Sequence, residues 1–249
     1  MTYQNDAALA ERLARTAGEL LTTLRASKLF EDRAAGEAGD AIAHQFIVRA
    51  LAEARPEDAV LSEEGAADPA RLACRRVWIV DPLDGTREYS EGRSDWAVHV
   101  ALAVDGEPVA GAVALPGLGL VLSSHATDAL CAPAARLRML VSRTRPGADS
   151  VAVAERIGAD LVAMGSAGAK AMAVVRGEAD IYLHSGGQHE WDSCAPAAVA
   201  LACGLHASRI DGRALLYNQA DTYLPDLLIC RPEHAARVLT LVRAEVAER

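Results

Sequence analysis

The sequence predicts an α/β protein with an α+β N-terminal half and an α/β C-terminal half. Two amphipathic helical patterns come first, followed by apolar strand-like segments joined by short turns. After about residue 138 short strands alternate with helices, as in α/β folds. We therefore expect an N-terminal subdomain over residues 1–138 and a C-terminal subdomain over 139–249. No linker or low-complexity segment separates them, so we expect them to pack as one body.

In the first half, the apolar spacing predicts helices over residues 7–27 and 40–55, separated by the glycine-containing segment 34–39. Asp40 lies where the second helix would have its N-cap, and Pro56 would end that helix. Strands are expected at 59–61, 77–80, 96–104, 109–115 and 118–123, with a hairpin turn at Asp105 and Gly106. These segments predict two helices and an antiparallel meander.

In the second half, short apolar runs alternate with helical patterns. Pro232 suits the first turn of a closing helix. The expected strands are 139–141, 161–164, 181–183 and 227–230, and the expected helices are 150–157, 167–176, 193–203 and 232–247.

Charge and composition exclude several classes of protein. The chain has 249 residues and a net charge of −9, without a basic run that would suit a nucleic-acid polymer. Its N-terminus is polar, unlike a signal peptide, and no apolar run approaches the ~20 residues of a membrane span. An odd number of cysteines without CxxC spacing predicts buried free thiols in a reducing cytoplasm; they are Cys74, Cys131, Cys194, Cys203 and Cys230.

The stretch "WIVDPLDGTREY" places two carboxylates directly after a buried strand. Such groups are costly to bury without a partner. Asp84 could simply cap the following turn, but this explanation leaves Asp81 without a partner at the strand end. The alternative is a bound cation.

Acidic residues fall at several other predicted ends of elements. Mg²⁺ prefers oxygen ligands, often a few carboxylates together with water and a substrate phosphate. Asp192 could equally be the N-cap of the helix that follows it. The acids at element ends are Glu63, Glu64, Asp81, Asp84 and Asp192.

The turn itself suits both a cation and an anion. Pro82 stiffens it, and the carbonyl of Leu83 is free to act as a further oxygen ligand. Gly85 and Thr86 would start a helix whose exposed N–H groups suit a phosphate.

Three motifs resemble the inositol monophosphatase superfamily of Mg²⁺-dependent, lithium-sensitive phosphatases. They are "LSEEG", "WIVDPLDGTREY" and "EWDSCAPAAVALACG", in the order of that family. The resemblance runs over most of the chain and implies the layered α-β-α-β-α sandwich of inositol monophosphatases and fructose bisphosphatases. With "GSAGAKAMAVVRGEADIYLH", the sequence is most similar to the CysQ branch, 3′(2′),5′-bisphosphate nucleotidases that act on 3′-phosphoadenosine 5′-phosphate (PAP).

The resemblance implies two or three Mg²⁺ ions in one site. Glu63, Asp81 and the Leu83 carbonyl would hold one ion, and Asp81, Asp84 and Asp192 would hold the second.

The resemblance also implies catalytic roles. Glu63, or Asp40 with Thr86, would orient an attacking water molecule, and the N–H groups of Gly85 and Thr86 would hold the phosphate to be cleaved. The sequence before Asp40, "AAGEAGD", departs from the family pattern "SPVTxAD". Helix capping therefore stays an alternative role for Asp40.

Further substrate contacts are expected from "SRTRPG" and "GSAGAK". These are Ser142, Arg143, Ser166 and Lys170, with Asp192 as a shared contact. The alternatives are a solvated loop for the first segment and a surface position for the Lys170 ammonium.

The implied reaction is hydrolysis of the 3′-phosphate of PAP to AMP, linked to sulfate assimilation. Inositol-1-phosphate and fructose 1,6-bisphosphate are alternative substrates, and a non-catalytic phosphometabolite sensor is a further alternative. The expected partner is thus a phosphorylated small molecule, and a homodimer is left open.

Overall fold

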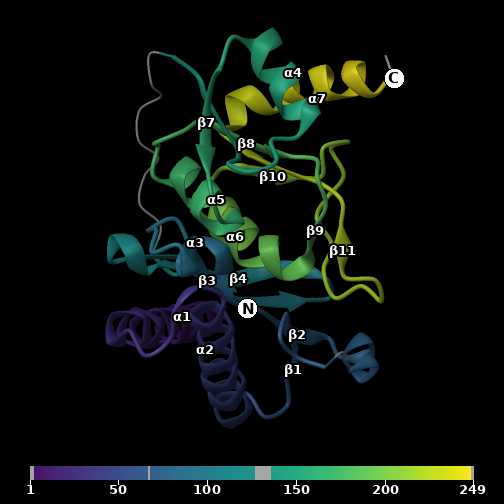
Figure 1. Ribbon diagram of the computed structural model, residues 1–249. Coiled ribbons are helices and arrows are strands. Elements are labelled where there is room, and N and C mark those ends of the chain that lie inside the picture. The colour runs from purple at the N-terminus through teal and green to yellow at the C-terminus, as the bar shows by residue number, and fades with distance from the viewer. Residues whose placement is uncertain (1–2, 67, 127–135, 248–249) are drawn as a thin grey trace.

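The computed structural model describes residues 3–66, 68–126 and 136–247 and arranges them in five layers (Figure 1). Two helices, a sheet, two helices, a second sheet and two helices follow one another, which confirms the predicted α-β-α-β-α sandwich. In the described part of the chain, no helix is long and apolar enough to cross a membrane. The outer helices are α1 (Gln4–Ser27) and α2 (Asp32–Ala54) on one side and α4 (Ala148–Ile157) and α7 (Pro232–Ala247) on the other; the central pair is α5 (Ala167–Val175) and α6 (Glu190–Ala202).

The first sheet is the predicted meander with one parallel strand added. Its order is β1-β2-β3-β4-β5, antiparallel except that β1 runs parallel to β2. The short helix α3 (Thr86–Ser90) follows β2 directly. The strands are β1 (Ala59–Ser62), β2 (Arg76–Asp84), β3 (Ala97–Val104), β4 (Glu107–Leu115) and β5 (Leu120–Ser123).

Both faces of this sheet are buried, so its strands read as continuous apolar runs. In β3, Val98 and Val100 face the core under α1 and α2, whereas Ala97 and Ala101 face the core around α5 and α6. The alternation places His99 on the α5 and α6 side. A lone imidazole in an apolar strand therefore points toward the middle of the molecule.

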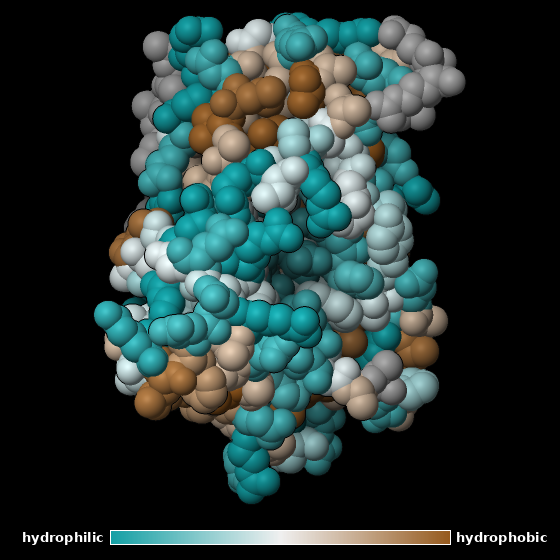
Figure 2. Space-filling view, viewed as in Figure 1, coloured by the Kyte–Doolittle hydropathy of each residue, from teal (hydrophilic) through white to brown (hydrophobic). Residues whose placement is uncertain are grey.

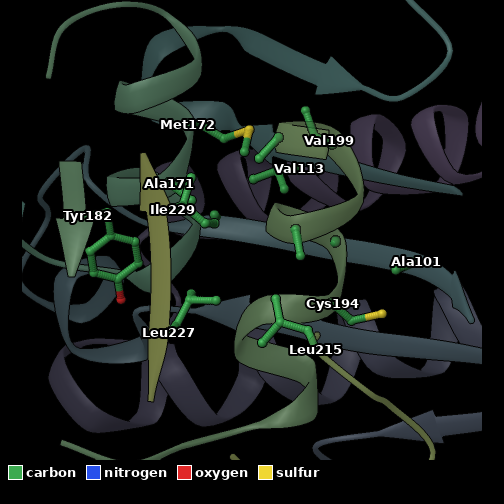
Figure 3. Close-up of a cluster of buried hydrophobic side chains, with 14 of the residues drawn as sticks. Ala101, Val113, Ala171, Met172, Tyr182, Cys194, Val199, Leu215, Leu227 and Ile229 are labelled. Atoms are coloured by element: carbon green, nitrogen blue, oxygen red, sulfur yellow. The ribbon is translucent and has the colours of Figure 1, made fainter. Parts of the chain in front are cut away.

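The second sheet has the order β10-β12-β8-β6-β7, with β6 parallel to β7 and β8. Its inner face and that of the first sheet enclose α5 and α6, where Val113, Met172, Val199 and Ile229 meet (Figure 3). The division into subdomains near residue 138 stays a prediction. The strands are β6 (Arg138–Ser142), β7 (Asp160–Met164), β8 (Ile181–His184), β10 (His206–Ser208) and β12 (Leu227–Cys230).

Two helix starts differ from the sequence prediction. Helix α2 begins at Asp32, so Asp40 is a buried residue inside the helix and not its N-cap. The glycines before Asp40 lie inside the helix and do not break it. Gly36 permits close packing against α3, since a β-carbon there would lie 2.6 Å from Cγ2 of Thr86. Helix α6 begins at Glu190, so Asp192 lies in its first turn and is not the N-cap.

Several small elements were not predicted. A two-stranded sheet joins β9 (Gln188–His189) to β11 (Tyr223–Leu224), and short 3₁₀ helices span Pro69–Ala73 and Pro116–Leu118. Among the cysteines, Cys194 and Cys230 are buried free thiols as expected, Cys74 and Cys203 are half-buried, and Cys131 lies outside the described residues.

Candidate active site

The parallel pairing of β1 with β2 brings two acids together. Parallel strands end at the same edge of a sheet, and the N–H of Glu63, just after β1, donates to the Val80 carbonyl of β2. The carboxyl groups of Glu63 and Asp81 lie close enough to hydrogen-bond to each other. The distant motifs "LSEEG" and "DPLDGT" thus meet because of strand pairing.

A bulge at the end of β2 places Asp81 and Asp84 on the same side. In a regular strand, residues three apart point to opposite faces of the sheet. Here Asp81 pairs with His99 and Asp84 pairs with Ala97, so β2 carries one extra residue at this point. The extra residue reverses the alternation and turns both carboxylates inward.

Helix α6 supplies the third carboxylate. Carboxylate oxygens of Asp81, Asp84 and Asp192 all lie within 4.8 Å of one another, a group that could hold a metal ion. Asp192 is fixed by the backbone N–H of His189, which donates to its Oδ2 at 2.6 Å. Figure 2 shows a hydrophilic hollow in the middle of this face, between the regions of α3 and α5 on one side and β9 and β11 on the other.

The clustered acids hold protons more tightly than isolated ones. Burial, followed by the charges of Glu63 and Asp84, raises the pKa of Asp81 well above its usual range. Burial of its carboxyl group raises the pKa of Glu63 to about 7, and burial and the nearby Asp84 raise that of Asp192 to about 6. A cation would remove this repulsion, so the donor set fits a hard divalent metal.

Asp84 has a second role that the sequence does not reveal. Although burial opposes ionisation, the pKa of Asp84 falls to about 2, because His99, the Ser166 hydroxyl and the Gly168 N–H stabilise its charge. Oδ2 accepts from Ser166 Oγ at 2.5 Å and from the Gly168 N–H at 2.6 Å, and Oδ1 accepts from the Ala167 N–H at 3.1 Å. Asp84 therefore anchors the N-terminus of α5 in addition to facing the acid cluster.

His99 completes this arrangement, and sequence reasoning missed it. Its Nδ1 donates to the Trp191 carbonyl at 3.0 Å, and its Nε2 lies 3.1 Å from Oδ2 of Asp84. Although burial opposes protonation, the Asp84 carboxylate raises the pKa of His99. The available signal was one polar residue inside "WAVHVALAV", since a buried imidazole needs hydrogen-bond partners.

Asp40, Thr86 and Leu83 meet at the edge of the cluster. The Thr86 hydroxyl lies 3.3 Å from Asp40 Oδ2 and 3.2 Å from the Leu83 carbonyl oxygen. Asp40 Oδ1 is buried and has no hydrogen-bond partner. Burial and the charges of Glu64 and Glu63 raise the pKa of Asp40 to about 7. The predicted pair of Asp40 and Thr86 is therefore in contact, with one carboxylate oxygen still open to a ligand.

Gly85 makes the transition from β2 to α3. Its φ of 90° lies in the left-handed region that favours glycine, and it occupies the N-cap position of α3, as expected for the start of a helix. Its carbonyl accepts from the Tyr89 N–H at 2.9 Å.

The structure gives Ser142 and Arg143 partners of their own. Arg143 donates to Glu88 at 2.8 Å and to Glu91 at 2.9 Å, so its guanidinium is held by α3 and the residue after it. Ser142 Oγ accepts from the Arg145 N–H. Because β6 and β7 are parallel, this loop and the one at Gly165 leave the same sheet edge.

Ser166 and Lys170 both form hydrogen bonds at the start of α5. Ser166 bonds Asp84 and caps α5 by accepting from the Ala169 N–H. The Lys170 ammonium is buried and donates to the carbonyls of Gly165 and Ser166 at 2.7 and 2.6 Å. Its burial rules out the surface position that was the alternative for Lys170, and the expected reach to a phosphate stays a prediction. Lys170 ties together the turn that carries the Asp84 anchor.

Fold and site define a layered α/β protein with a carboxylate-rich site suited to a metal ion. The sequence model of the Inositol monophosphatase family matches residues 3–132 and 126–247. The chain therefore belongs to the inositol monophosphatase family, a family of phosphatases.

Individual relatives agree with this assignment. The chain is 50% identical, over 96% of its length and 93% of the relative's, to the 3′-phosphoadenosine 5′-phosphate phosphatase of Mycobacterium leprae (strain TN). It is 29% identical, over 75% of its length and 81% of the relative's, to the 3′(2′),5′-bisphosphate nucleotidase CysQ of Escherichia coli (strain K12). The crystal structure of CysQ from Bacteroides thetaiotaomicron shares the fold, with a TM-score of 0.79, 24% identity and coverage of 92% of this chain and 98% of that one.

Proposed function

We propose that this protein is a Mg²⁺-dependent phosphatase that hydrolyses the 3′-phosphate of PAP to AMP and thereby serves sulfate assimilation. The observation that carries the proposal is the meeting of Asp81, Asp84 and Asp192 within 4.8 Å. The names of the relatives from M. leprae and E. coli support PAP as the substrate. The cytoplasmic location and the homodimer stay predictions.

The resemblance to the family implies two ion positions. One position would use Glu63, Asp81 and the Leu83 carbonyl, and the other Asp81, Asp84 and Asp192; a third ion is compatible with the family. Bound Mg²⁺ would lower the pKa of a water molecule and neutralise charge on the phosphoryl group. The raised pKa values of Glu63 and Asp192 support a cation here, since like charges at this spacing otherwise retain protons.

Asp40 and Thr86 are the proposed partners of the attacking water, with Glu63 as a further contact. The unpartnered Oδ1 of Asp40 supports this role, because a buried carboxylate oxygen without a donor is costly. A pKa near 7 also suits a group that accepts a proton at neutral pH. The Thr86 hydroxyl would orient the Asp40 carboxylate.

The substrate contacts are divided between direct and indirect roles. We assign the cleaved phosphate to the N–H groups of Gly85 and Thr86 and the remainder of the substrate to Ser142 and Asp192. Arg143 would have to leave Glu88 and Glu91 to reach a phosphate. Ser166 and Lys170 would act on the site through Asp84 and the first turn of α5.

The test is phosphate release with Mg²⁺ from PAP, inositol-1-phosphate and fructose 1,6-bisphosphate, compared by kcat/KM. Asp81→Asn is the matched control, because it keeps the size of the side chain and removes the charge. A PAP preference abolished by this change is the expected result. A preference for inositol phosphate or the sugar bisphosphate would leave the proposed reaction standing and show that PAP is not the preferred substrate. Absence of turnover would favour a phosphometabolite sensor.

A further inference from the structure

Three aromatic rings form a cluster directly beside Asp192. The aromatic cluster consists of His189, Trp191 and Tyr223. The His189 ring stacks on Trp191 with centroids 4.7 Å apart and planes 8° from parallel, and the Tyr223 ring stands edge-on to His189 at 6.1 Å. His189 and Tyr223 are direct cross-strand partners in the β9–β11 pair, so their side chains share a face.

The cluster is fixed to the candidate metal site through the backbone. The N–H of His189 donates to Asp192, and the Trp191 carbonyl accepts from His99, which contacts Asp84. The His189 ring is also held by Thr222, 3.2 Å from its Nδ1. The rings therefore keep a set position relative to the acids.

The Tyr223 ring rests against the backbone and is open on its other side. Gly187 has a φ of 81°, and a β-carbon there would overlap the Tyr223 hydroxyl and ring. Even so, Tyr223 is 52% exposed, and His189 is exposed as well. Tyr223 and Leu224 also line a cavity of about 320 Å³. The Tyr223 ring is thus supported by the backbone of Gly187, and the cavity lies beside this ring alone of the three.

Isolated exposed aromatic side chains are common and do not by themselves indicate a binding site. Here two exposed rings sit on one small sheet, backed by a third, next to the hydrophilic hollow. The hydrophobic cores do not require this arrangement, because Tyr223 contributes to none of the buried clusters among the described residues. A planar, rigid and half-open aromatic surface suits the stacking of another aromatic ring.

We propose that the aromatic cluster seats the purine base of a nucleoside bisphosphate whose phosphate is cleaved at the acid cluster. The inference rests on the proposed function, since it presupposes a nucleotide substrate. Only one ribose separates a base from its 3′-phosphate, so the base must lie beside the cleavage site, as the cluster does. Stacking tolerates any base, and the cluster therefore selects nucleotides over sugar and inositol phosphates.

Tyr223→Leu is the decisive variant, with Tyr223→Phe as the conservative replacement and Leu161→Ala, on the exposed edge strand β7, as a surface control. The substrates are PAP and the base-free 1-deoxyribose 3,5-bisphosphate. Loss of one stacking contact, about 1–3 kcal/mol, corresponds to roughly a 5- to 140-fold change. We expect Tyr223→Leu to raise the KM for PAP by this factor relative to the base-free substrate, with a small change in kcat. Tyr223→Phe should restore wild-type selectivity.

An equal effect of Tyr223→Leu on both substrates, or no effect on either, would overturn the proposal. A second readout separates it from the proposed function: binding of AMP, with Mg²⁺ present, measured by calorimetry. If the wild-type protein does not hydrolyse PAP, the proposed function fails. In the calorimetric experiment, the base seat fails if AMP does not bind, or if it binds wild type and Tyr223→Leu equally well.

Discussion

Nε2 of His99 lies 3.1 Å from Oδ2 of Asp84, and these two buried side chains link neighbouring strands at the candidate metal site. The other ring nitrogen of His99 donates to the Trp191 carbonyl in α6. The imidazole therefore connects the motif that carries Asp84, at the end of β2, to the motif that carries Asp192, in α6. Positions of the carboxylates depend on packing as much as on the motifs themselves.

Gly168 is expected to tolerate no side chain. A β-carbon there would overlap Nε2 of His99, so Gly168→Ala should push the ring away from Asp84 and shift the first turn of α5. We expect a loss of about 1–3 kcal/mol in the free energy of unfolding, measured in urea, together with reduced phosphatase activity. In a His99→Asn background, Gly168→Ala should lower the free energy of unfolding by less. Strictly additive effects would show that His99 is not the obstacle.

The stability of the metal-free protein should fall as pH rises. Glu63, Asp192 and Asp40 have pKa values raised to about 7, 6 and 7 in the folded protein, so the folded state binds more protons than the unfolded one. The stabilisation is fully present below the unfolded pKa of about 4 and is lost as pH rises through about 6–7. In EDTA, the melting temperature should be lower at pH 8 than at pH 5. A rise over this range would contradict the buried acid cluster.

Mg²⁺ should reverse this loss. Ions at about 100 times their Kd add about 2.7 kcal/mol, and each kcal/mol raises Tm by about 2–4 °C in a protein of this size. The shift should be larger at pH 8 than at pH 5.5, because protons compete with the metal for the carboxylates. Differential scanning calorimetry with and without Mg²⁺ checks both statements. Identical melting with and without the ion would mean that the acids serve only as caps and anchors.

Asp81→Asn should separate stability from activity. It removes one charge from the acid cluster, so we expect the metal-free protein to gain about 1 kcal/mol at pH 8, or about 2–4 °C in Tm, by relief of repulsion. Phosphate release should be lost at the same time. A variant that is both less stable in EDTA and fully active would contradict the assignment of Asp81 as a ligand.

Asp40→Asn and Thr86→Val should lower kcat while leaving substrate binding nearly intact. Both remove a group proposed to orient or deprotonate water, a contribution of about 10²–10⁴-fold. Thr86→Ser keeps the hydroxyl and is the matched control. If Thr86→Val and Thr86→Ser behave alike in kcat, the hydroxyl contact with Asp40 has no catalytic role.

Lys170→Met should lower kcat/KM by the same factor for all substrates. The ammonium bonds the carbonyls of Gly165 and Ser166 inside the protein, so its removal should destabilise the turn that anchors Asp84. We therefore expect matching falls in kcat/KM for PAP and inositol-1-phosphate, with a lower Tm. A loss confined to PAP would instead indicate a direct contact between Lys170 and the second phosphate.

Local sequence patterns predicted most of the secondary structure. The long helices, the meander and the alternating second half follow from apolar periodicity and turn residues, which record which faces are buried. The predicted start of α2 was wrong, because Gly36 and Gly39 resemble helix-breaking residues in the sequence. In the structure they allow close packing against α3 and α1. A glycine has the same local signature in both uses, and only the neighbouring helix distinguishes them.

By itself the sequence determined the family, the layered architecture and the acids that end β1 and β2. Those features depend on residues that are close together along the chain. Tertiary structure alone decided that His99 joins Asp84 to α6, that Asp84 anchors α5, and that His189 and Tyr223 share a face. Asp84 and Ser166 are separated by 82 positions, and their contact exists because β2 and the N-terminus of α5 meet in the middle of the molecule. A polar residue shows in sequence that it needs a partner, and the packing of the layers selects which partner it obtains.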